Sequence, residues 1–298
     1  MGTMTEPTYL ITGATGYLGR RLVREAEMRG RVYAASRRPA AEASVGIPIE
    51  LDVSNRSAVQ RVVSELKPAV IIHAAAVNPG QGDDETMWQV NALGSDHVAE
   101  AAREVGSRLV AISTDVVHDG KHGPYDDAAA ASPINHYGRS KAAGESAVLA
   151  RAPAAAVVRT SLMYGLDEMD RGTAGFAKRI RRGESVTLFS DALRNPIRVD
   201  TLAVAILRLV ETAHSGTLNI AGRQVLSRDG YGRRMLEYWG VPTDGLLEAT
   251  RAADISSSIP LDARLRIDRA EELLGMDFAG VDTVLATAPD DAPSDAGL

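Results

Sequence analysis

The feature that most constrains the fold of this chain is an apolar strand that runs directly into a glycine-rich turn and a helix. Tyr9-Leu10-Ile11 is typical of a buried strand, and a helix is expected from about Tyr17. In the turn between them, Gly13 allows a tight bend, Gly16 lets the backbone approach a pyrophosphate, and Gly19 permits close packing of helix on strand. The N–H groups at the start of the helix can bind phosphate oxygens. The segment therefore predicts a dinucleotide site with contacts from Gly13, Thr15, Gly16, Tyr17, Leu18 and Gly19.

Strand and helix patterns then alternate along most of the chain, which is typical of an α/β fold: a doubly wound parallel sheet of the Rossmann type, with helices on both faces. The predicted strands lie near 8–12, 31–36, 47–51, 69–73, 108–113, 156–160 and 217–221. The predicted helices lie near 17–29, 55–66, 86–105, 136–150, 173–182 and 199–213.

The alternation also predicts the domain organisation. It accounts for residues 8–165 and 195–222, which we assign to the dinucleotide-binding domain. Residues 166–194 and 223–280 are left for a small C-terminal substrate-binding lobe. The segment 281–298 is rich in Ala, Asp and Pro and is expected to be a disordered tail.

The end of the second predicted strand bears on the choice of cofactor. In NAD-binding folds of this type an acidic residue at this position binds the ribose 2′-hydroxyl. This chain has Ser36-Arg37-Arg38 instead, and a hydroxyl with two guanidinium groups can bind a 2′-phosphate. The sequence therefore predicts NADP(H) in preference to NAD(H), with solvated loop arginines as the alternative.

The ends of the next three strands supply further predicted cofactor contacts, at Asp52, Val53, Ala74, Ala75, Ala76 and Ser113. The third strand closes where a side chain can meet the adenine. The fourth ends in small residues, as expected where backbone lies close to a ligand. The fifth delivers Thr114 to the carboxyl edge of the sheet, where open α/β sheets bind ligands. Thr114 can there donate a hydrogen bond to a substrate carbonyl.

Tyr137 and Lys141 are the strongest candidates for catalysis. Their spacing of four places the phenol and the ammonium on one face of a predicted helix. A neighbouring cation favours the phenolate, so we expect Lys141 to lower the pKa of Tyr137 from about 10 toward the working range of an acid-base catalyst. By itself this spacing is more often a solvated face of an amphipathic helix.

Six motifs in this order resemble those of the extended short-chain dehydrogenase/reductases: Thr12-Gly13-x-x-Gly16-x-x-Gly19, Leu51-Asp52-Val53, His73-Ala74-Ala75-Ala76, Val90-Asn91-Ala92-x-Gly94, Ser113-Thr114-Asp115 and Tyr137-x-x-x-Lys141. Within that family the chain is most similar to the branch of the dTDP-4-dehydrorhamnose reductases and the regulatory β subunit of methionine adenosyltransferase. The narrower match lies in Ser113–Gly120, Tyr137–Glu145, Arg159-Thr160-Ser161, Asn195-Pro196-Ile197 and Pro260-Leu261-Asp262.

The resemblance implies roles by position. Tyr137 is expected to protonate the carbonyl oxygen, Lys141 to hold the nicotinamide ribose, Thr114 to orient the carbonyl, and Asn91 to support the site. Substrate contacts are expected at Val116, Leu162, Met163 and Arg194. The rhamnose-forming enzymes typically have an aromatic residue where Val116 stands and a tryptophan in the stretch of Leu162-Met163, so the sugar itself is left open.

The implied function is NADPH-dependent reduction of a keto group on a deoxysugar nucleotide. Two alternatives stay open. One is epimerisation of a nucleotide sugar on the same fold, and the other is a non-catalytic, NADP-binding regulatory subunit of a partner enzyme. Trp88, Tyr125, Tyr164 and Phe176 are candidates for lining the substrate pocket, although burial in the core is the simpler interpretation of each.

Composition and charge exclude several other classes. The chain has no cysteine, and its six histidines show no metal-ligand spacing, so neither disulfides nor a metal site are expected. The net charge of −6 is concentrated in residues 271–298, which hold seven acidic residues and no Lys or Arg, so we expect no nucleic-acid partner. Without an apolar stretch of about 20 residues or a signal peptide, a cytoplasmic protein that does not cross a membrane is expected. A homodimer is kept open.

Overall fold

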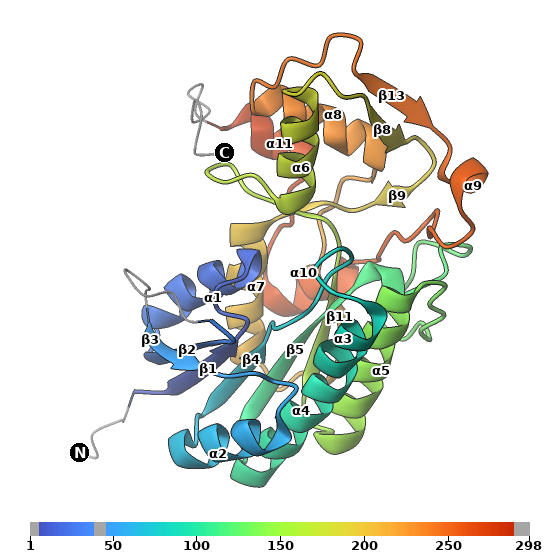
Figure 1. Ribbon diagram of the computed structural model, residues 1–298. Helices are drawn as coiled ribbons and strands as arrows, with labels where there is room; N and C mark the ends of the chain where they lie inside the picture. The colour runs from blue at the N-terminus through green and yellow to red at the C-terminus, as the bar shows by residue number, and fades with distance from the viewer. Residues whose placement is uncertain (1–5, 39–45, 289–298) are drawn as a thin grey trace. The chain divides into compact units, whose positions relative to one another are not determined.

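The computed structural model describes residues 6–38 and 46–288, and they fall into two compact units. Unit 1 is drawn from Met1–Val117, Asn135–Arg159 and Leu202–Leu218, and unit 2 from His118–Ile134, Thr160–Thr201 and Asn219–Leu298. Each unit is described by itself below, with the helix and strand labels of Figure 1.

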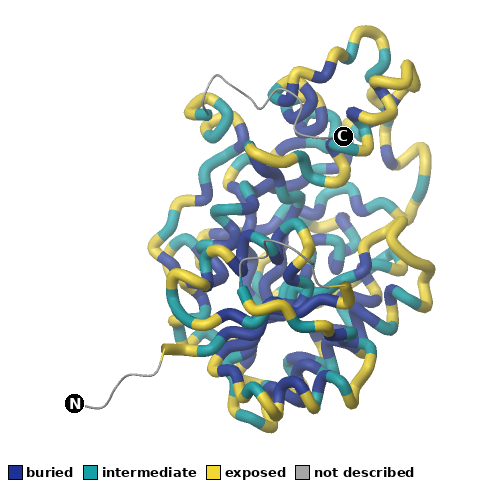
Figure 2. The backbone as a smooth tube through the Cα atoms, turned by 60° about the vertical axis from the view of Figure 1, so that its left-hand side comes forward, coloured by how far each residue is buried: buried dark blue, intermediate teal, exposed yellow. Residues whose placement is uncertain are grey.

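Unit 1 is built on a seven-stranded sheet in the order β11-β6-β5-β4-β1-β2-β3. The described pairs along β4–β1–β2–β3 and β4–β5 are all parallel. The strands are largely buried (Figure 2), since apolar residues face helices on both sides. Their bounds are Thr8–Thr12 for β1, Arg31–Ser36 for β2, Ile47–Glu50 for β3, Val70–His73 for β4, Arg108–Thr114 for β5, Ala156–Thr160 for β6 and Gly216–Asn219 for β11.

Helices cover both faces of this sheet. On one face α2 (Arg56–Leu66), α4 (Gly94–Val105) and α5 (His136–Arg151) share an apolar cluster with the strands. On the other lie α1 (Tyr17–Glu27) and α7 (Val199–Val210), and Arg29 after α1 pairs with Glu211 after α7 at 2.5 Å (Figure 1). The predicted α/β fold with a doubly wound parallel sheet is confirmed.

One predicted helix is three elements in the structure. The segment 86–105 consists of α3 (Asp84–Trp88), the π-helical turn η1 (Gln89–Leu93) and α4. A π-helical turn inserts one extra residue, and such turns are frequent at functional sites. Asn91 lies in the middle of η1.

Unit 2 contains three two-stranded sheets and several short helices. The sheets pair β7 (Met163–Tyr164) with β10 (Ile197–Arg198), β9 (Leu193–Arg194) with β12 (Leu226–Ser227), and β8 (Val186–Phe189) with β13 (Leu247–Thr250). The helices of unit 2 are α6 (Arg171–Ile180), α8 (Arg228–Tyr238), α9 (Ala252–Ile255), α10 (Asp268–Leu274) and α11 (Val281–Ala286), whereas the 3₁₀ turn η2 (Asp115–Val117) belongs to unit 1. Tyr164, Leu188, Met235 and Leu236 form the centre of its apolar core.

The prediction that a disordered tail begins at residue 281 is wrong. Residues Val281–Ala286 form α11, because Val281 is fully buried in the core of unit 2 and Asp282 bonds Arg234 and Gln224. Residues 289–298 lie outside the described residues. Within residues 6–38 and 46–288, no helix has the length and apolar character that a membrane span requires.

Candidate active site

The glycine turn is packed so tightly against the end of β4 that side chains are excluded from it. Gly13 has a φ of +70°, and a Cβ added there would lie 2.6 Å from the Ala75 nitrogen and 2.7 Å from the Ala74 carbonyl oxygen. A Cβ on Gly19 would lie 2.1 Å from the Gly13 oxygen. The sequence prediction for these two glycines, a tight turn and close helix packing, therefore has a direct geometric basis here.

Helix α1 begins without a capping side chain and without an acidic residue in its first turn. Gly16 is the N-cap in an extended conformation, no side chain caps the helix, and its first turn contains no Asp or Glu. Thr15 is exposed, Tyr17 half-buried and Leu18 buried. A helix start of this kind offers backbone N–H donors and the positive end of the helix dipole, which suit the phosphates of a dinucleotide.

The end of β2 combines a buried hydroxyl with two exposed cations. The Ser36 Oγ is buried and has no hydrogen-bond partner among the described residues, while Arg37 and Arg38 are exposed. A buried hydroxyl without a partner is costly unless a ligand satisfies it.

The ends of β3, β4 and β5 place the remaining predicted cofactor residues. Asp52 is half-buried and accepts hydrogen bonds from the nitrogen and hydroxyl of Ser54, so its carboxylate also shapes the local turn. Val53 is buried, and a Cβ on Gly94 would lie 2.8 Å from its Cγ2 atom. The segment Ala74–Ala76 is half-buried beside the glycine turn. The buried Ser113 Oγ has no hydrogen-bond partner among the described residues.

The predicted catalytic residues lie on β5 and α5 of unit 1. Helix α5 begins at His136, where the Asn135 side chain caps it by accepting from the Gly138 nitrogen. The Thr114 hydroxyl at the end of β5 lies close enough to the Tyr137 phenol to influence its pKa. Lys141 is 5% exposed, and its Nζ donates to the Ile112 carbonyl of β5 at 2.7 Å. The structure thus brings Thr114, Tyr137 and Lys141 to one place.

The electrostatics differ from the sequence expectation. Burial and the charge of Asp115 raise the pKa of Tyr137, and the nearby Thr114 hydroxyl lowers it by less. The predicted lowering of this pKa by Lys141 is wrong for the protein without ligands, because burial disfavours the charged phenolate and Asp115 adds a like charge. Burial lowers the pKa of Lys141 itself to about 8, against the opposing effect of Glu145. Tyr137 is consequently a protonated phenol at neutral pH.

Asn91 is fully buried and connects three segments of unit 1. Its Oδ1 accepts from the Val77 nitrogen at 2.8 Å, and its Nδ2 donates to the Val77 oxygen at 2.9 Å and to the Ser140 Oγ at 3.0 Å. Ser140 stands next to Lys141 on α5. Asn91 therefore fixes the catalytic helix to the loop after β4, which agrees with the supporting role that the resemblance implied.

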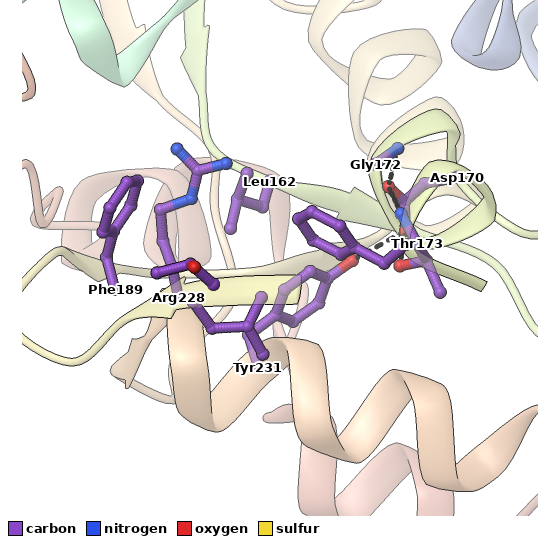
Figure 3. A pocket seen from close by; sticks show the side chains of 10 residues that line it. Leu162, Asp170, Gly172, Thr173, Phe189, Arg228 and Tyr231 are labelled. Carbon is purple, nitrogen blue, oxygen red and sulfur yellow. Dashed lines mark hydrogen bonds between the residues drawn. The ribbon is translucent and has the colours of Figure 1, made fainter. Parts of the chain in front are cut away.

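Unit 2 contains a small pocket with a volume of about 60 Å³ that is partly open to solvent. Figure 3 shows Arg228 beside Phe189, with Leu162 near them and Asp170 and Thr173 at the opposite side. The Arg228 guanidinium lies 5.8 Å from the centre of the Phe189 ring. The Tyr231 hydroxyl donates to Asp170 at 3.1 Å, and Asp170 caps α6.

Most residues of this pocket could not be predicted from the sequence, because several separate segments of unit 2 contribute to it. Of the aromatic candidates, Phe176 lines it, whereas Tyr164 is fully buried and Tyr125 bonds Asp119 at 2.6 Å. Trp88 is 42% exposed on α3 of unit 1. The one signal available in the sequence was Asp170, an N-cap residue ahead of a helical pattern.

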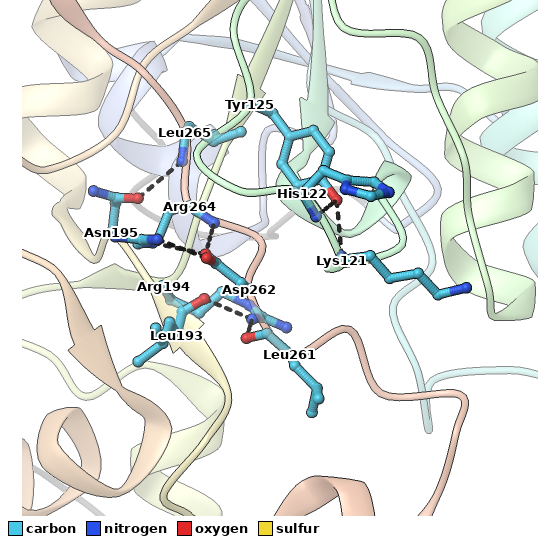
Figure 4. A network of polar contacts seen from close by, with 10 residues as sticks. All are labelled: Lys121, His122, Tyr125, Leu193, Arg194, Asn195, Leu261, Asp262, Arg264 and Leu265. Atoms are coloured by element: carbon cyan, nitrogen blue, oxygen red, sulfur yellow. Dashed lines mark hydrogen bonds and ion pairs between the residues drawn. The ribbon is translucent and has the colours of Figure 1, made fainter.

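The predicted substrate residues occupy different environments. Val116 is half-buried in η2 of unit 1, Leu162 lines the unit 2 pocket, and Met163 is half-buried in β7. Arg194 is 3% exposed, and its guanidinium donates to the carbonyl oxygens of Leu193 and Leu261 (Figure 4). It also donates to the carbonyl oxygen of Pro260. These bonds hold the chain at Pro260-Leu261 against β9. A substrate contact of Arg194 stays a prediction.

The family model described as the RmlD substrate binding domain matches residues 8–288. The chain belongs to the RmlD substrate-binding domain family. This family falls within the extended short-chain dehydrogenase/reductase branch that the sequence motifs resemble, so that prediction is confirmed.

Relatives of this RmlD-family chain include reductases and a subunit of a methionine adenosyltransferase. It is 34% identical over 241 residues to the dTDP-4-dehydrorhamnose reductase of Mycobacterium tuberculosis (strain H37Rv), covering 78% of this chain and 75% of that protein. It is 27% identical over 277 residues to methionine adenosyltransferase 2 subunit beta of Rattus norvegicus, covering 89% and 81%.

Among solved structures, dTDP-4-dehydrorhamnose reductase from Bacillus anthracis in complex with NADP matches with a TM-score of 0.80 and 27% identity, covering 95% of this chain and 98% of that one. The Bordetella bronchiseptica enzyme WbmH in complex with NAD+ matches with a TM-score of 0.81 at 19% identity, which shows a shared fold only.

Proposed function

We propose that this chain is an NADPH-dependent reductase that acts on the keto group of a deoxysugar nucleotide. This is the type of reaction for which its dTDP-4-dehydrorhamnose reductase relatives are named. The observation that carries the proposal is the closeness of the Thr114 hydroxyl to the Tyr137 phenol, with the buried Lys141 on the same helix as Tyr137. The family membership and the reductase relatives support it.

The residues of unit 1 fit a dinucleotide. The Gly13 turn leaves no room for side chains, the start of α1 offers backbone donors, and Ser36 has a buried hydroxyl without a partner among the described residues. The turn and the helix start would hold the phosphates, and Ser113 and Lys141 would lie near the nicotinamide ribose. Bound NADPH would supply the hydride; the protein supplies the orientation and the proton.

Three side chains account for the proton transfer. The Thr114 hydroxyl donates to Asp115 at 3.2 Å in the free protein and would turn to the substrate carbonyl oxygen. The Tyr137 phenol, protonated at neutral pH because burial raises its pKa, would donate its proton to that oxygen as the alkoxide develops. The Lys141 ammonium, on the same face of α5, would stabilise the phenolate that remains.

The direct test follows the reduced-nicotinamide absorbance with NADPH and dTDP-4-dehydrorhamnose. We expect net loss of NADPH, and Tyr137→Phe should reduce kcat about 10²–10⁴-fold while NADPH affinity stays within about twofold. An exposed residue of the same helix, Arg139, provides the control variant Arg139→Gln. Unchanged turnover in Tyr137→Phe would remove the tyrosine from the mechanism.

We further propose that the cofactor preference is for NADPH over NADH. Ser36, Arg37 and Arg38 support it, because charge-assisted bonds to a 2′-phosphate exist only with NADPH. The double variant Arg37→Gln/Arg38→Gln should weaken NADPH binding about 10- to 100-fold and change NADH binding less than about twofold. Arg61→Gln, at an exposed position on α2, is the matched control. Equal losses for both cofactors would contradict the assignment.

For the substrate, we propose that the unit 2 pocket binds the nucleotide part. Phe189 offers a ring for stacking, and Arg228 offers a cation beside it. Arg228→Met should weaken binding of dTDP about tenfold in calorimetric titration. Arg233→Met, on the same helix but in an exposed pair with Asp229, should leave dTDP binding unchanged.

The similarity to a methionine adenosyltransferase subunit favours one rival, a regulatory subunit that binds NADP without turnover. That function predicts co-purification with a larger partner and no NADPH consumption with any nucleotide sugar. An epimerase would convert the sugar without net NADPH loss. The absorbance assay, together with analysis of the sugar product, separates all three.

A further inference from the structure

We propose that His73 is a positioning residue of this site: hydrogen bonds on both of its ring nitrogens hold the glycine turn and the π-helical turn around Asn91 in a fixed relation. The inference rests on the proposed reductase function only for its kinetic consequence. His73 is the last residue of β4, is 1% exposed and lies in register with Thr12, the last residue of β1.

A chain of four hydrogen bonds runs through the ring. The Ala75 nitrogen donates to the Thr12 Oγ1 at 3.3 Å, and this hydroxyl lies 2.8 Å from the His73 Nδ1. On the other side, the His73 Nε2 lies 3.1 Å from the Ser95 Oγ, which donates to the Asn91 carbonyl oxygen at 2.7 Å. Every bond lies within unit 1.

The direction of each bond follows from counting protons. The Ser95 hydroxyl has one proton, and it donates this proton to the backbone carbonyl oxygen of Asn91. The His73 Nε2 must therefore donate its own proton to the Ser95 Oγ. The Nδ1 is then an acceptor, and Thr12 donates to it. In the opposite tautomer, Ser95 would have to donate to the His73 Nε2 and could not donate to the Asn91 carbonyl oxygen. The Thr12 hydroxyl would then receive two hydrogen bonds, from the His73 Nδ1 and the Ala75 nitrogen, and its own proton would have no acceptor in this chain of bonds. The ring is therefore neutral with its proton on Nε2.

The first end of the chain is the cofactor turn. Ala75 is the residue whose nitrogen lies 2.6 Å from the position of a Cβ on Gly13. The Ala74 nitrogen also donates to the Thr12 carbonyl oxygen at 3.2 Å. Since no space remains between these backbones, a shift of Thr12 or Ala75 moves the Gly13 turn with it.

The second end is the catalytic helix. The Asn91 side chain bonds Ser140, between Tyr137 and Lys141, and a Cβ on Gly144 would lie 2.3 Å from the Asn91 oxygen that Ser95 binds. A shift of Ser95 or of this carbonyl therefore reaches α5. Bonding of a serine to the carbonyl four residues earlier also bends helices, which agrees with the π-helical turn at this point.

The charges around the ring favour the same arrangement. Burial, together with the smaller effect of the nearby Lys141, lowers the pKa of His73 to about 3, so the imidazole does not become a second cation beside the Lys141 ammonium. Hydrogen bonds at both nitrogens fix the orientation of the ring and the direction of each bond, so the imidazole sets the distance between Thr12 and Ser95.

The test removes one side of the chain at a time. Thr12→Val should raise the dissociation constant of NADPH about tenfold, read by nicotinamide fluorescence, and leave kcat at saturating NADPH within about twofold. Ser95→Ala should leave NADPH affinity within about twofold and lower kcat about tenfold with dTDP-4-dehydrorhamnose. Thr212→Val and Ser107→Ala remove comparable side-chain bonds, to Leu209 and Pro68, and should change neither quantity. The proposal is overturned when Thr12→Val and Ser95→Ala behave like these controls, or when both lose affinity and kcat together.

The ring itself gives a readout that needs no substrate. In ¹⁵N spectra of the full chain, compared with His73→Gln for assignment, the His73 ring should keep its proton on Nε2 and not titrate between about pH 5 and 8. A protonated Nδ1 or a titrating ring would refute the arrangement. Should wild-type protein consume no NADPH with the sugar, the proposed function fails, while the NADPH affinity of Thr12→Val and this spectrum still decide the role of His73.

Discussion

Gly19→Ala tests the packing of the cofactor turn, because at this position helix propensity and packing act in opposite directions. Alanine in a helix normally stabilises by about 0.5–1 kcal/mol relative to glycine. In α1 the new Cβ would lie 2.1 Å from the Gly13 oxygen, 2.8 Å from the Gly13 carbonyl carbon and 2.9 Å from the Ala14 Cα. All three atoms belong to the backbone, so no side chain can rotate away.

Relief of this contact requires a shift of roughly 1 Å between two packed backbones, and overpacking of that kind costs about 1–3 kcal/mol or more. After the gain in helix propensity, we expect Gly19→Ala to lower the free energy of unfolding by about 2 kcal/mol. The melting temperature should fall by about 2–4 °C for each kcal/mol. The displaced turn should also weaken NADPH binding by at least about tenfold.

Gly175→Ala in α6 is the matched control, because it is the same substitution in an exposed helix position with nothing within 4 Å of the new Cβ. It should stabilise by about 0.5–1 kcal/mol. Melts followed by circular dichroism and NADPH titrations on the three proteins provide the comparison. A Gly19→Ala protein that melts at or above the wild-type temperature would refute the packing argument.

Three further predictions concern buried charge. The pKa of Lys141 is about 8 in the folded protein and 10.5 as its ordinary value. Between these two pH values the unfolded state binds more protons than the folded state, so the free energy of unfolding of the wild type rises with pH. The advantage of Lys141→Met over wild type in free energy of unfolding should therefore shrink across this range. The pKa of His73 is about 3 in the folded protein and 6.5 as its ordinary value, so the unfolded state binds a proton first as the pH falls. The wild type should therefore lose about 2 kcal/mol of free energy of unfolding between pH 6.5 and about pH 5. His73→Gln should not show this loss when both proteins are compared by their urea midpoints. Glu145→Ala removes the carboxylate bonded to the buried Arg159 and should cost about 3–5 kcal/mol in urea unfolding, whereas Glu184→Ala, which breaks an exposed pair with Arg179, should cost less than about 1.

Features that depend on local pattern could be predicted from the sequence. The strand β1, the turn after it and α1 follow from an apolar run, glycine spacing and amphipathic periodicity, and the observed bounds agree closely. Helix α5 begins at its predicted residue because Asn135 caps it. Tyr137 and Lys141 share one face of that helix, and their spacing alone determines this.

Features that depend on tertiary contacts could not be predicted. The extra residue in η1 is invisible to periodicity, because its stabilising partners are Val77 and Ser140, far from Asn91 in the sequence. The role of His73 depends on two neighbours from other elements, Thr12 and Ser95. The unit 2 pocket depends on segments between Leu162 and Tyr231 that carry no shared pattern.

The pKa of Tyr137 shows how such contacts affect the choice of reaction. Spacing predicts a phenol activated by an ammonium, but burial and Asp115 keep the proton on Tyr137 in the protein without ligands. Reduction of a ketone needs this residue first as an acid, so the protonated phenol is already the reactive form. Epimerisation begins with removal of a proton from a hydroxyl and needs the phenolate first, which the same surroundings disfavour. In the protein without ligands, the surroundings of Tyr137 thus keep it in the protonated form that the reduction of a ketone uses first.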